Sequence, residues 1–471
     1  MTAVDYWDGL NVRQKAGLLA FVGSLVLSFL AFFSDPVINR DGMLYVDMAR
    51  NIAGHGGTGE RFNWPFFSFF LAGAIKVSPF GDVTTSMMVV SLFTAAASAV
   101  LAVLLAWHTP ARFMFLAVLV ALAFPGFNES RSQILRDWPA WFFSLSAIWT
   151  LFRFEASGCW RYVLVGVVLL LLGMLCRLEV AGLAMALGLA WGLKTGRRKY
   201  LLLGGALTFA ALVGLWVVFQ GDFGERVQLY VDALNVVTRY ETFMTIANEF
   251  AAQFIHPYSQ EYAGLVLLVG LLSIIPAQLL GVLGPYALVF FTRGAAVSDS
   301  EKRIYSTVFV VWFVVLSVFL TAYFLLSSRY VVLLGLVLLP WLFARFVQAY
   351  GRWSPRWRAF AVFILAVMAL SGAYSSSARE KMFLVKAGDW LTDQAQPVVY
   401  FNDPRVSFYA GGTYFMTPMK EPEPAQSGEL FVWLLDRSEV AAVVEAHQSS
   451  LQQVKLFDTG SDDVVLVMSA L

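Results

Sequence analysis

Four short polar segments interrupt an otherwise apolar sequence and carry the side chains that could do chemistry. The first, RDGMLYVDMARNI, begins with Asp41 and has Tyr45 one helical turn later in an amphipathic stretch. A carboxylate at the boundary between water and lipid can act as a general base. An N-cap aspartate at the start of a helix explains the same residue equally well. Asp41 is therefore a candidate catalytic residue with a structural alternative.

The other three segments are rich in arginine. They are FNESRSQILRDWP, CRLEVAGLA and SSRYVVLLGLVLLP, which contain the candidate residues Arg131, Asp137, Arg177, Glu179, Arg329 and Tyr330. A guanidinium makes forked hydrogen bonds to phosphate oxygens, so these segments could bind an anionic headgroup. Helix capping is the simpler interpretation of Asp137 taken alone, and ordinary polar turns could explain the arginines.

The elements that must position these side chains are apolar helices. Hydrophobic residues make up 59% of the 471 residues and charged residues only 14%, and the mean hydropathy is +0.68. Soluble domains carry roughly 25% charge. This composition excludes a cytosolic enzyme, a coiled coil and a disordered chain, and a net charge of +1 gives no argument for nucleic acid binding. Four scattered histidines and two cysteines form no metal motif, so we expect no cofactor.

Apolar runs predict a multi-pass α-helical membrane protein with about eleven transmembrane helices. A bilayer core of about 30 Å needs roughly 20 apolar residues per helix. The first run is expected to be a retained anchor, since the residues before it do not resemble a signal peptide. The predicted spans are 16–33, 82–107, 113–127, 138–152, 162–176, 180–193, 200–220, 263–292, 304–326, 330–348 and 359–374.

The distribution of basic residues predicts the orientation. With the N-terminus in the cytoplasm, the inner segments hold 15 Lys and Arg in 56 residues, whereas the outer segments hold 10 in 106. This excess inside is typical of bacterial inner-membrane proteins. If residues 64–80 formed a span, the basic cluster KTGRRK would face outward, so we expect a membrane-edge or re-entrant helix there. The start NWP favours Asn63 as its N-cap.

The predicted domains are a membrane domain over residues 1–374 and a soluble α/β domain over residues 375–471, expected in the periplasm. The membrane domain has outer loops at 34–81 and 221–262, and the second of these is expected to form helices lying over the membrane. In the soluble domain, β-like runs alternate with a helix-like run. The β-like runs are 398–401, 430–435 and 464–468, and the helix-like run is 439–447.

Taken together, the four segments and the helix start NWPFFSFF resemble motifs of the GT-C superfamily of membrane glycosyltransferases, in particular protein O-mannosyltransferases and aminoarabinose transferases. The resemblance covers about residues 16–345 and rests on Asp41 and Tyr45 in RDGMLYVDMARNI, NWPFFSFF, ILRDWPAWFF, CRLEVAGLA and SSRYVVLLGLVLLP. The family often has two prolines in its second motif, where this chain has one. Each motif is short, and their order and outward placement carry the likeness.

The resemblance implies a polyprenyl-phosphate-linked sugar donor, a glycan, lipid or protein acceptor, and a reaction at the outer face of the membrane. Asp41 would take the proton of the acceptor hydroxyl, and inversion in a single displacement would follow. Arg329, with Arg177 or Arg131, would stabilise the leaving phosphate. A divalent ion is not expected, although Asp41 and Asp137 could in principle hold one. Two alternatives stay open, a lipid or sugar transporter or flippase and a non-catalytic subunit of a glycan assembly system.

Overall fold

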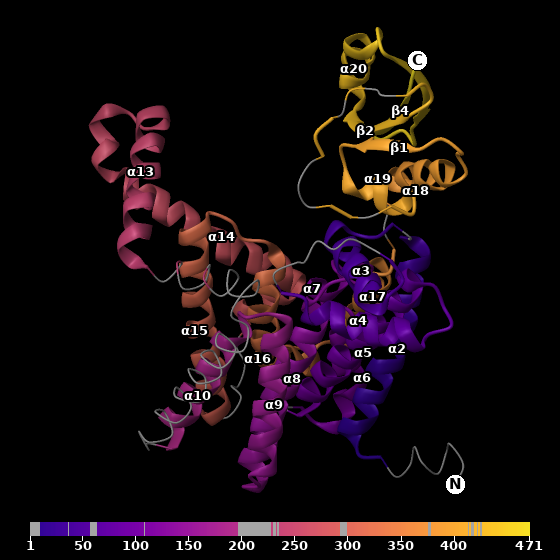
Figure 1. Ribbon diagram of the computed structural model, residues 1–471. Helices are drawn as coiled ribbons and strands as arrows, with labels where there is room; N and C mark the ends of the chain where they lie inside the picture. The colour runs from indigo at the N-terminus through magenta and orange to yellow at the C-terminus, as the bar shows by residue number, and fades with distance from the viewer. Residues whose placement is uncertain are drawn as a thin grey trace. The chain divides into compact units, whose positions relative to one another are not determined.

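The computed structural model is mostly helical and has a small sheet near its C-terminus (Figure 1). It describes residues 10–35, 37–56, 64–107, 109–195, 228, 232, 235–292, 299–374, 378–412, 414–415, 419–421, 423 and 426–471. The predicted span 200–220, most of the loop segment 221–235 and the expected N-cap Asn63 lie outside these described residues.

The helices before the C-terminal segment follow the apolar runs of the sequence. They are α2 (Val12–Ser34), α3 (Arg40–Ala53), α4 (Phe66–Val77), α5 (Asp82–Trp107), η1 (Ala111–Phe113), α6 (Met114–Leu122), α7 (Pro125–Asn128), α8 (Asp137–Ser157), α9 (Arg161–Cys176), α10 (Val180–Thr195), α13 (Val236–Phe254), η2 (Pro257–Tyr262), α14 (Ala263–Leu283), η3 (Gly284–Phe291), α15 (Asp299–Tyr323), α16 (Ser328–Arg352) and α17 (Pro355–Ser371).

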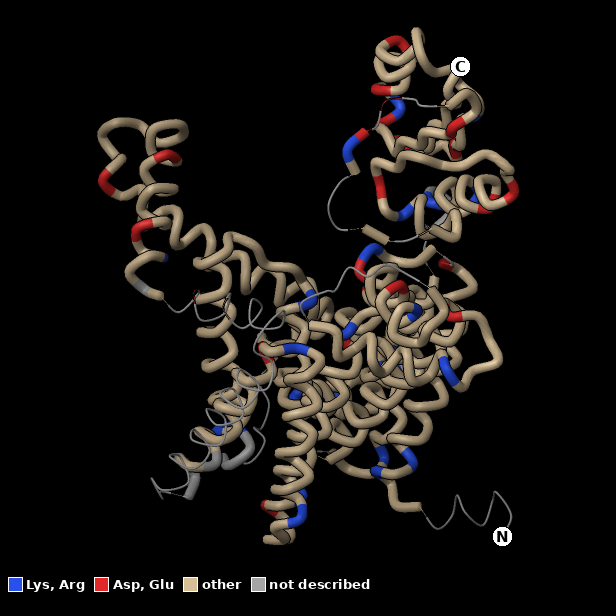
Figure 2. Tube along the Cα trace, in the orientation of Figure 1, with Lys and Arg blue, Asp and Glu red and all other residues tan. Residues whose placement is uncertain are grey.

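Within the described part of the chain, five helical segments are long and apolar enough to cross a membrane. They are Val12–Ser34, Asp82–Trp107, Pro257–Phe291, Lys302–Tyr323 and Ser328–Arg352. Figure 2 shows long stretches of helix without charge, with the charged residues gathered mainly at helix ends and in the C-terminal segment. Since unpaired charges are costly in lipid, this arrangement supports a membrane-embedded helical protein.

Two of the predicted spans are interrupted. The helix expected over 113–127 ends at Leu122, because Phe124 takes an extended backbone before Pro125. The run over 263–292 forms α14 only to Leu283, where Gly284 has a φ of 52° and a 3₁₀-helix follows. The predicted span over 113–127 is therefore wrong as one helix, whereas the segment over 263–292 is still long and apolar enough to cross a membrane despite its change of helix type.

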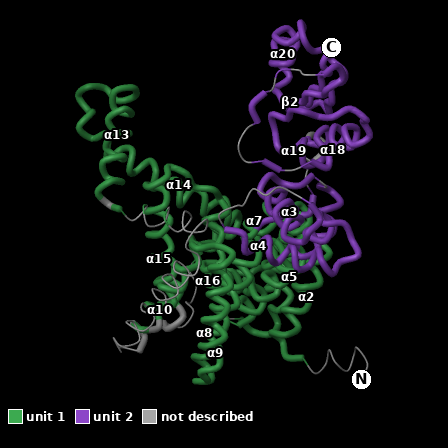
Figure 3. The backbone as a smooth tube through the Cα atoms, in the orientation of Figure 1, with its two compact units in different colours: residues 1–27, 91–131, 136–372 green, residues 28–90, 132–135, 373–471 purple. Residues whose placement is uncertain are grey.

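The chain divides into two compact units, neither of which is one continuous stretch (Figure 3). The first contains residues 1–27, 91–131 and 136–372, and the second contains residues 28–90, 132–135 and 373–471. The expected soluble domain, 375–471, thus belongs to a unit that also includes the segment 34–81, predicted as an outer loop.

The helices of the first unit pack closely through small residues. Helix α8 runs along α9, where a Cβ added at Gly166 would lie 2.7 Å from Thr150 Oγ1. Helix α2 approaches α6 in the same way, since a Cβ at Gly23 would lie 2.8 Å from Leu122 Cδ1. Small residues let helix backbones approach in this manner in membrane proteins.

In the second unit, the two helices expected in the first outer loop are confirmed as α3 and α4. Tyr45 of α3 packs edge-on against Phe67 of α4, with ring centroids 5.3 Å apart, and Ser68 Oγ donates to the Tyr45 carbonyl. With only 12 residues, α4 is about 18 Å long, which is shorter than the core of a bilayer.

The C-terminal segment forms a four-stranded mixed sheet of order β1-β2-β4-β3. Its elements are α18 (Ala378–Thr392), β1 (Val398–Phe401), α19 (Pro404–Tyr409), β2 (Leu430–Asp436), η4 (Arg437–Glu439), α20 (Val440–His447), β3 (Leu451–Phe457) and β4 (Asp463–Ala470). Leu430 and Val432 pack toward α18 and α19, whereas Phe431 and Trp433 pack toward α20. This alternation places helices on both faces, so the predicted α/β fold of this segment is confirmed.

Candidate functional site

A buried ion cluster forms where α9 ends and α8 begins, within the first unit. Arg177 follows the last residue of α9 with an extended backbone, so its side chain turns back toward α8. Its guanidinium donates to Glu179 through Nη2 at 3.3 Å and Nε at 3.5 Å, and it pairs with Asp137 at the start of α8. The exposed fractions of the three side chains are 8% for Arg177, 3% for Asp137 and 9% for Glu179. The segment CRLEVAGLA is therefore more than a polar turn.

The charges of this cluster keep Glu179 ionised. Burial on its own would raise the pKa of the Glu179 carboxyl, but the charges of Arg177 and Arg136 outweigh burial and lower the pKa to about 2. Glu179 therefore carries a negative charge at neutral pH and is unsuited to act as a general acid. Its role is to hold the Arg177 guanidinium.

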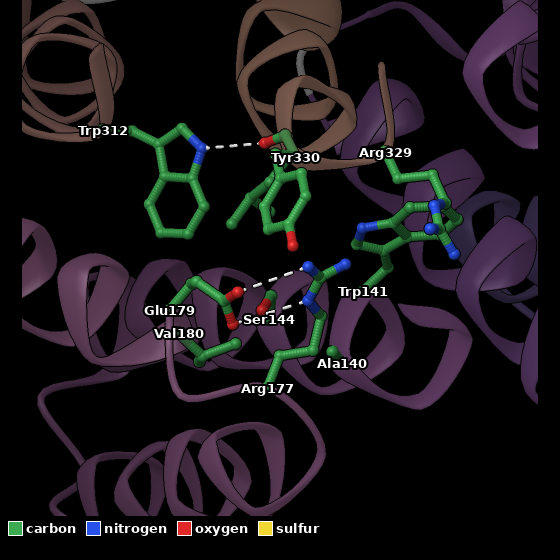
Figure 4. Close-up of a pocket in the computed structure, with 10 residues that line it drawn as sticks. Ala140, Trp141, Ser144, Arg177, Glu179, Val180, Trp312, Arg329 and Tyr330 are labelled. Atoms are coloured by element: carbon green, nitrogen blue, oxygen red, sulfur yellow. Dashed lines mark hydrogen bonds and ion pairs between the residues drawn. The ribbon is translucent and has the colours of Figure 1, made fainter. Parts of the chain in front are cut away.

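A small pocket opens beside the Arg177–Glu179 pair (Figure 4). It is lined by Ala140, Trp141, Ser144, Arg177, Glu179, Val180, Trp312, Arg329, Tyr330 and Leu333. The Tyr330 ring stands over the Arg177 guanidinium with 4.4 Å between ring centroid and Cζ, and Trp312 Nε1 donates to the Tyr330 carbonyl at 3.3 Å. The pocket has about 20 Å³ of space for water-sized groups, little more than one water molecule needs. Without rearrangement, the pocket accepts a small polar group of a larger ligand.

The wall of the pocket contains a hydroxyl with no hydrogen-bond partner among the described residues. Ser144 is fully buried, and its Oγ is unsatisfied. A buried polar atom left without a partner costs about 1–3 kcal/mol. A bound ligand or water that accepts from Ser144 would recover this energy, which makes the pocket a candidate binding site.

The structure brings together five of the residues predicted from the sequence. Arg177, Glu179, Arg329 and Tyr330 line the pocket, and Asp137 holds Arg177 from α8. Sequence reasoning missed the pocket's aromatic walls and Ser144. Ser144 lies seven residues after Asp137, two turns along the same face of a helix, and that spacing was the one signal that could have indicated it.

Arg131, also predicted to bind substrate, lies away from the pocket in the first unit and makes hydrogen bonds within the protein interior. It is fully buried and donates to Asn128 Oδ1 through Nη2 at 3.0 Å, and to Ser24 Oγ through Nη1 at 2.9 Å. Asn128 in turn donates to the Met368 carbonyl at 3.1 Å. Arg131 therefore ties the turn after α7 to α2 and is not part of the pocket lining.

Asp41 and Tyr45 lie in the second unit. Asn39 occupies the N-cap position of α3 and Asp41 lies half-buried in the first turn, whereas Tyr45 is buried against α4. Arg136 likewise precedes Asp137 at the start of α8. The N-cap interpretation is therefore wrong for both aspartates. A carboxylate in the first turn is still favoured by the positive end of the helix dipole.

The described residues contain no group of three or more His, Cys, Asp or Glu side chains placed to hold a metal ion. No model of a known protein family matches this chain, and no curated protein sequence matches it.

Proposed function

We propose that the protein is a membrane glycosyltransferase that moves a sugar from a polyprenyl-phosphate-linked donor to an acceptor hydroxyl. The observation that carries the proposal is the pocket between α8, α15 and α16. Two guanidinium groups, those of Arg177 and Arg329, line this pocket together with the buried hydroxyl of Ser144. Guanidinium and hydroxyl groups are hydrogen-bond donors that suit a phosphate oxygen.

The chemical roles follow from residue type. Arg329 and Arg177 would stabilise the phosphate as the bond between its oxygen and the anomeric carbon breaks. Asp41 would accept the proton of the acceptor hydroxyl as that oxygen bonds to the anomeric carbon, with inversion in one displacement. Since the cations take up the developing charge, this scheme requires no metal ion.

We also propose the full topology, with eleven spans in the inner membrane. The N-terminus would lie in the cytoplasm, and the second unit's C-terminal sheet would lie in the periplasm. The positive-inside distribution of Lys and Arg supports this orientation.

Purified protein in lipid vesicles, supplied with a polyprenyl-phosphate sugar and an acceptor glycan, tests the proposal. Asp41→Asn should abolish transfer and leave donor binding intact, because the amide cannot accept the proton. Arg329→Ala should weaken donor binding by at least tenfold. Arg352→Ala, exposed at the far end of the same helix α16, is the matched control and should change neither quantity.

The vesicle assay and a test in cells distinguish the transferase from the two alternative functions. Full transfer by the Asp41→Asn variant would contradict the assignment of Asp41 as the general base. Movement of the labelled donor across the bilayer without a glycosidic product would instead identify a transporter or flippase. Unchanged envelope glycans in cells that carry a double Asp41→Asn, Arg329→Ala variant would favour a non-catalytic subunit.

A further inference from the structure

The core of the C-terminal sheet extends into the first outer loop, within the second unit. Val37, which precedes α3, is 8% exposed and packs in one cluster with Phe383 and Leu384 of α18 and with Val406 of α19. The sheet domain therefore completes its core with a residue that lies more than 330 positions earlier in the chain. The segment that leads into Asp41 is part of that core.

Tyr409, the last residue of α19, holds the next residue of this segment. The Ile38 N–H donates to the Tyr409 hydroxyl oxygen at 2.8 Å. Burial raises the pKa of Tyr409 to about 12, so the phenol stays neutral at physiological pH. The contact is tight on the other side too, because a Cβ added at Gly388 of α18 would lie 2.3 Å from Tyr409 Cβ. Helices α18 and α19 thus fix where the phenol ring stands.

The two residues that follow Ile38 are held as well. The Asn39 side chain accepts from the Ile134 N–H at 2.8 Å and donates to the Ile134 carbonyl at 3.4 Å. Arg40 Nε donates to the Tyr414 hydroxyl at 3.3 Å. Each of the three residues before Asp41 is therefore fixed by a partner distant in sequence, two of them by tyrosines of the C-terminal domain.

We propose that Tyr409 is a positioning residue that sets the first turn of α3 and, through it, the carboxylate of Asp41. The C-terminal domain then serves the transfer reaction itself, by orienting the base. The catalytic part of this inference rests on the proposed function, whereas the positioning of the helix start does not.

Tyr409→Phe removes only the hydroxyl, and Tyr374→Phe, at a tyrosine that is 66% exposed, is the matched control. Hydrogen–deuterium exchange of the peptide over 37–46 should become about tenfold faster in Tyr409→Phe and stay unchanged in Tyr374→Phe, since one buried N–H loses its acceptor. In the vesicle assay, kcat should fall by several-fold to about tenfold at an unchanged KM for the donor. Tyr414→Phe should shift both readouts in the same direction by less.

The two readouts separate the two claims. Unchanged exchange over 37–46 in folded Tyr409→Phe protein overturns the inference. Faster exchange with an unchanged kcat also overturns it, because the helix start would then have no influence on the base. If the wild-type protein transfers no sugar, the proposed function fails, and the exchange rates alone decide whether Tyr409 holds α3.

Discussion

At the scale of single residues, Arg177 is the residue that joins the buried ion cluster of the first unit. Taking a guanidinium and two carboxylates out of water costs several kcal/mol per ion, which only good geometry and further hydrogen bonds can offset. Here Arg177 meets Asp137, Glu179 and the Tyr330 ring at once. Removing one partner should therefore destabilise the protein more than the loss of an exposed ion pair would.

Asp137→Asn tests this expectation. We expect the free energy of unfolding to fall by about 3 kcal/mol, because Arg177 loses one of its two buried counter-charges. Thermal unfolding in detergent measures the change. Asp458→Asn, which breaks the exposed pair with Arg437, is the control and should leave the transition unmoved. Equal shifts in the two variants would contradict the assignment of Arg177 as a buried centre.

Glu179 predicts a pH dependence. Its folded-state pKa of about 2 lies below the ordinary value of 4.5, so its charge stabilises the fold above pH 4.5 and that contribution is lost as pH falls toward 2. Wild-type protein should therefore lose more stability than Glu179→Gln across this interval. Unfolding temperatures measured from neutral to acid pH give the two curves, and parallel curves would show that Glu179 is not ion-paired.

The sequence indicated most of these residues by type but not their partners. Arg177 and Glu179 stand out because they interrupt two apolar runs. Nothing in the sequence says that Asp137, 40 positions earlier, is the counter-ion of Arg177. Arg131 has the same residue type and a similar context, yet it binds a hydroxyl and an amide in the interior. Only the packing of the helices distinguishes these two arginines.

At the scale of elements, the start of α3 in the second unit is held by close contacts on several sides. Gly42 lies in its first turn, where an added Cβ would meet Asn39 Oδ1 at 2.6 Å and the Ile134 and Ile38 side chains at 2.9 Å. These neighbours are the residues that hold the helix start, so they cannot move away without breaking the hydrogen bonds between Asn39 and Ile134.

Gly42→Ala should accordingly lower the free energy of unfolding by about 1–3 kcal/mol, the usual cost of overpacking. Gly73→Ala is the matched control, since the glycine lies in α4 with open space around its missing Cβ. Alanine there should be neutral or slightly stabilising, because it favours helix over glycine. Thermal unfolding of the two purified variants measures these changes in stability. A Gly42→Ala variant as stable as the wild-type protein would contradict the close contact.

Apolar runs indicated three of the four strands but missed the edge strand β3. The predicted run 430–435 lies in β2, whose side chains alternate between two covered faces, and the predicted runs 398–401 and 464–468 lie in β1 and β4. Strand β3, with the sequence LQQVKLF, exposes its five middle residues and resembles a loop in composition. It lies at the edge of the sheet, where a strand needs little apolar surface.

At the scale of the whole molecule, the proposed topology makes a prediction about two native cysteines. Cys159 is exposed between α8 and α9, in a segment that the topology places in the cytoplasm, and Cys176 is buried. A membrane-impermeant maleimide should therefore leave intact cells unlabelled and react once the membrane is opened.

Two variants complete this labelling experiment. Cys159→Ser should abolish the reaction after opening, because the remaining thiol is buried. Ser461→Cys, in the turn before β4, should react in cells whose outer membrane alone is permeabilised. Labelling of Cys159 when the outer membrane alone is permeabilised would show that the protein has the opposite orientation to the one proposed.

The sequence by itself indicated that lipid surrounds much of the protein, and it indicated the class of fold and most of the candidate residues. Composition requires lipid, apolar runs define helices, and isolated charges stand out against them, because each of these depends on local residue type. The tertiary structure decided which charges meet, that α6 ends before Pro125, and that Val37 and Ile38 belong with the C-terminal domain. These features arise from contacts between residues far apart in the chain, and such contacts leave no local pattern.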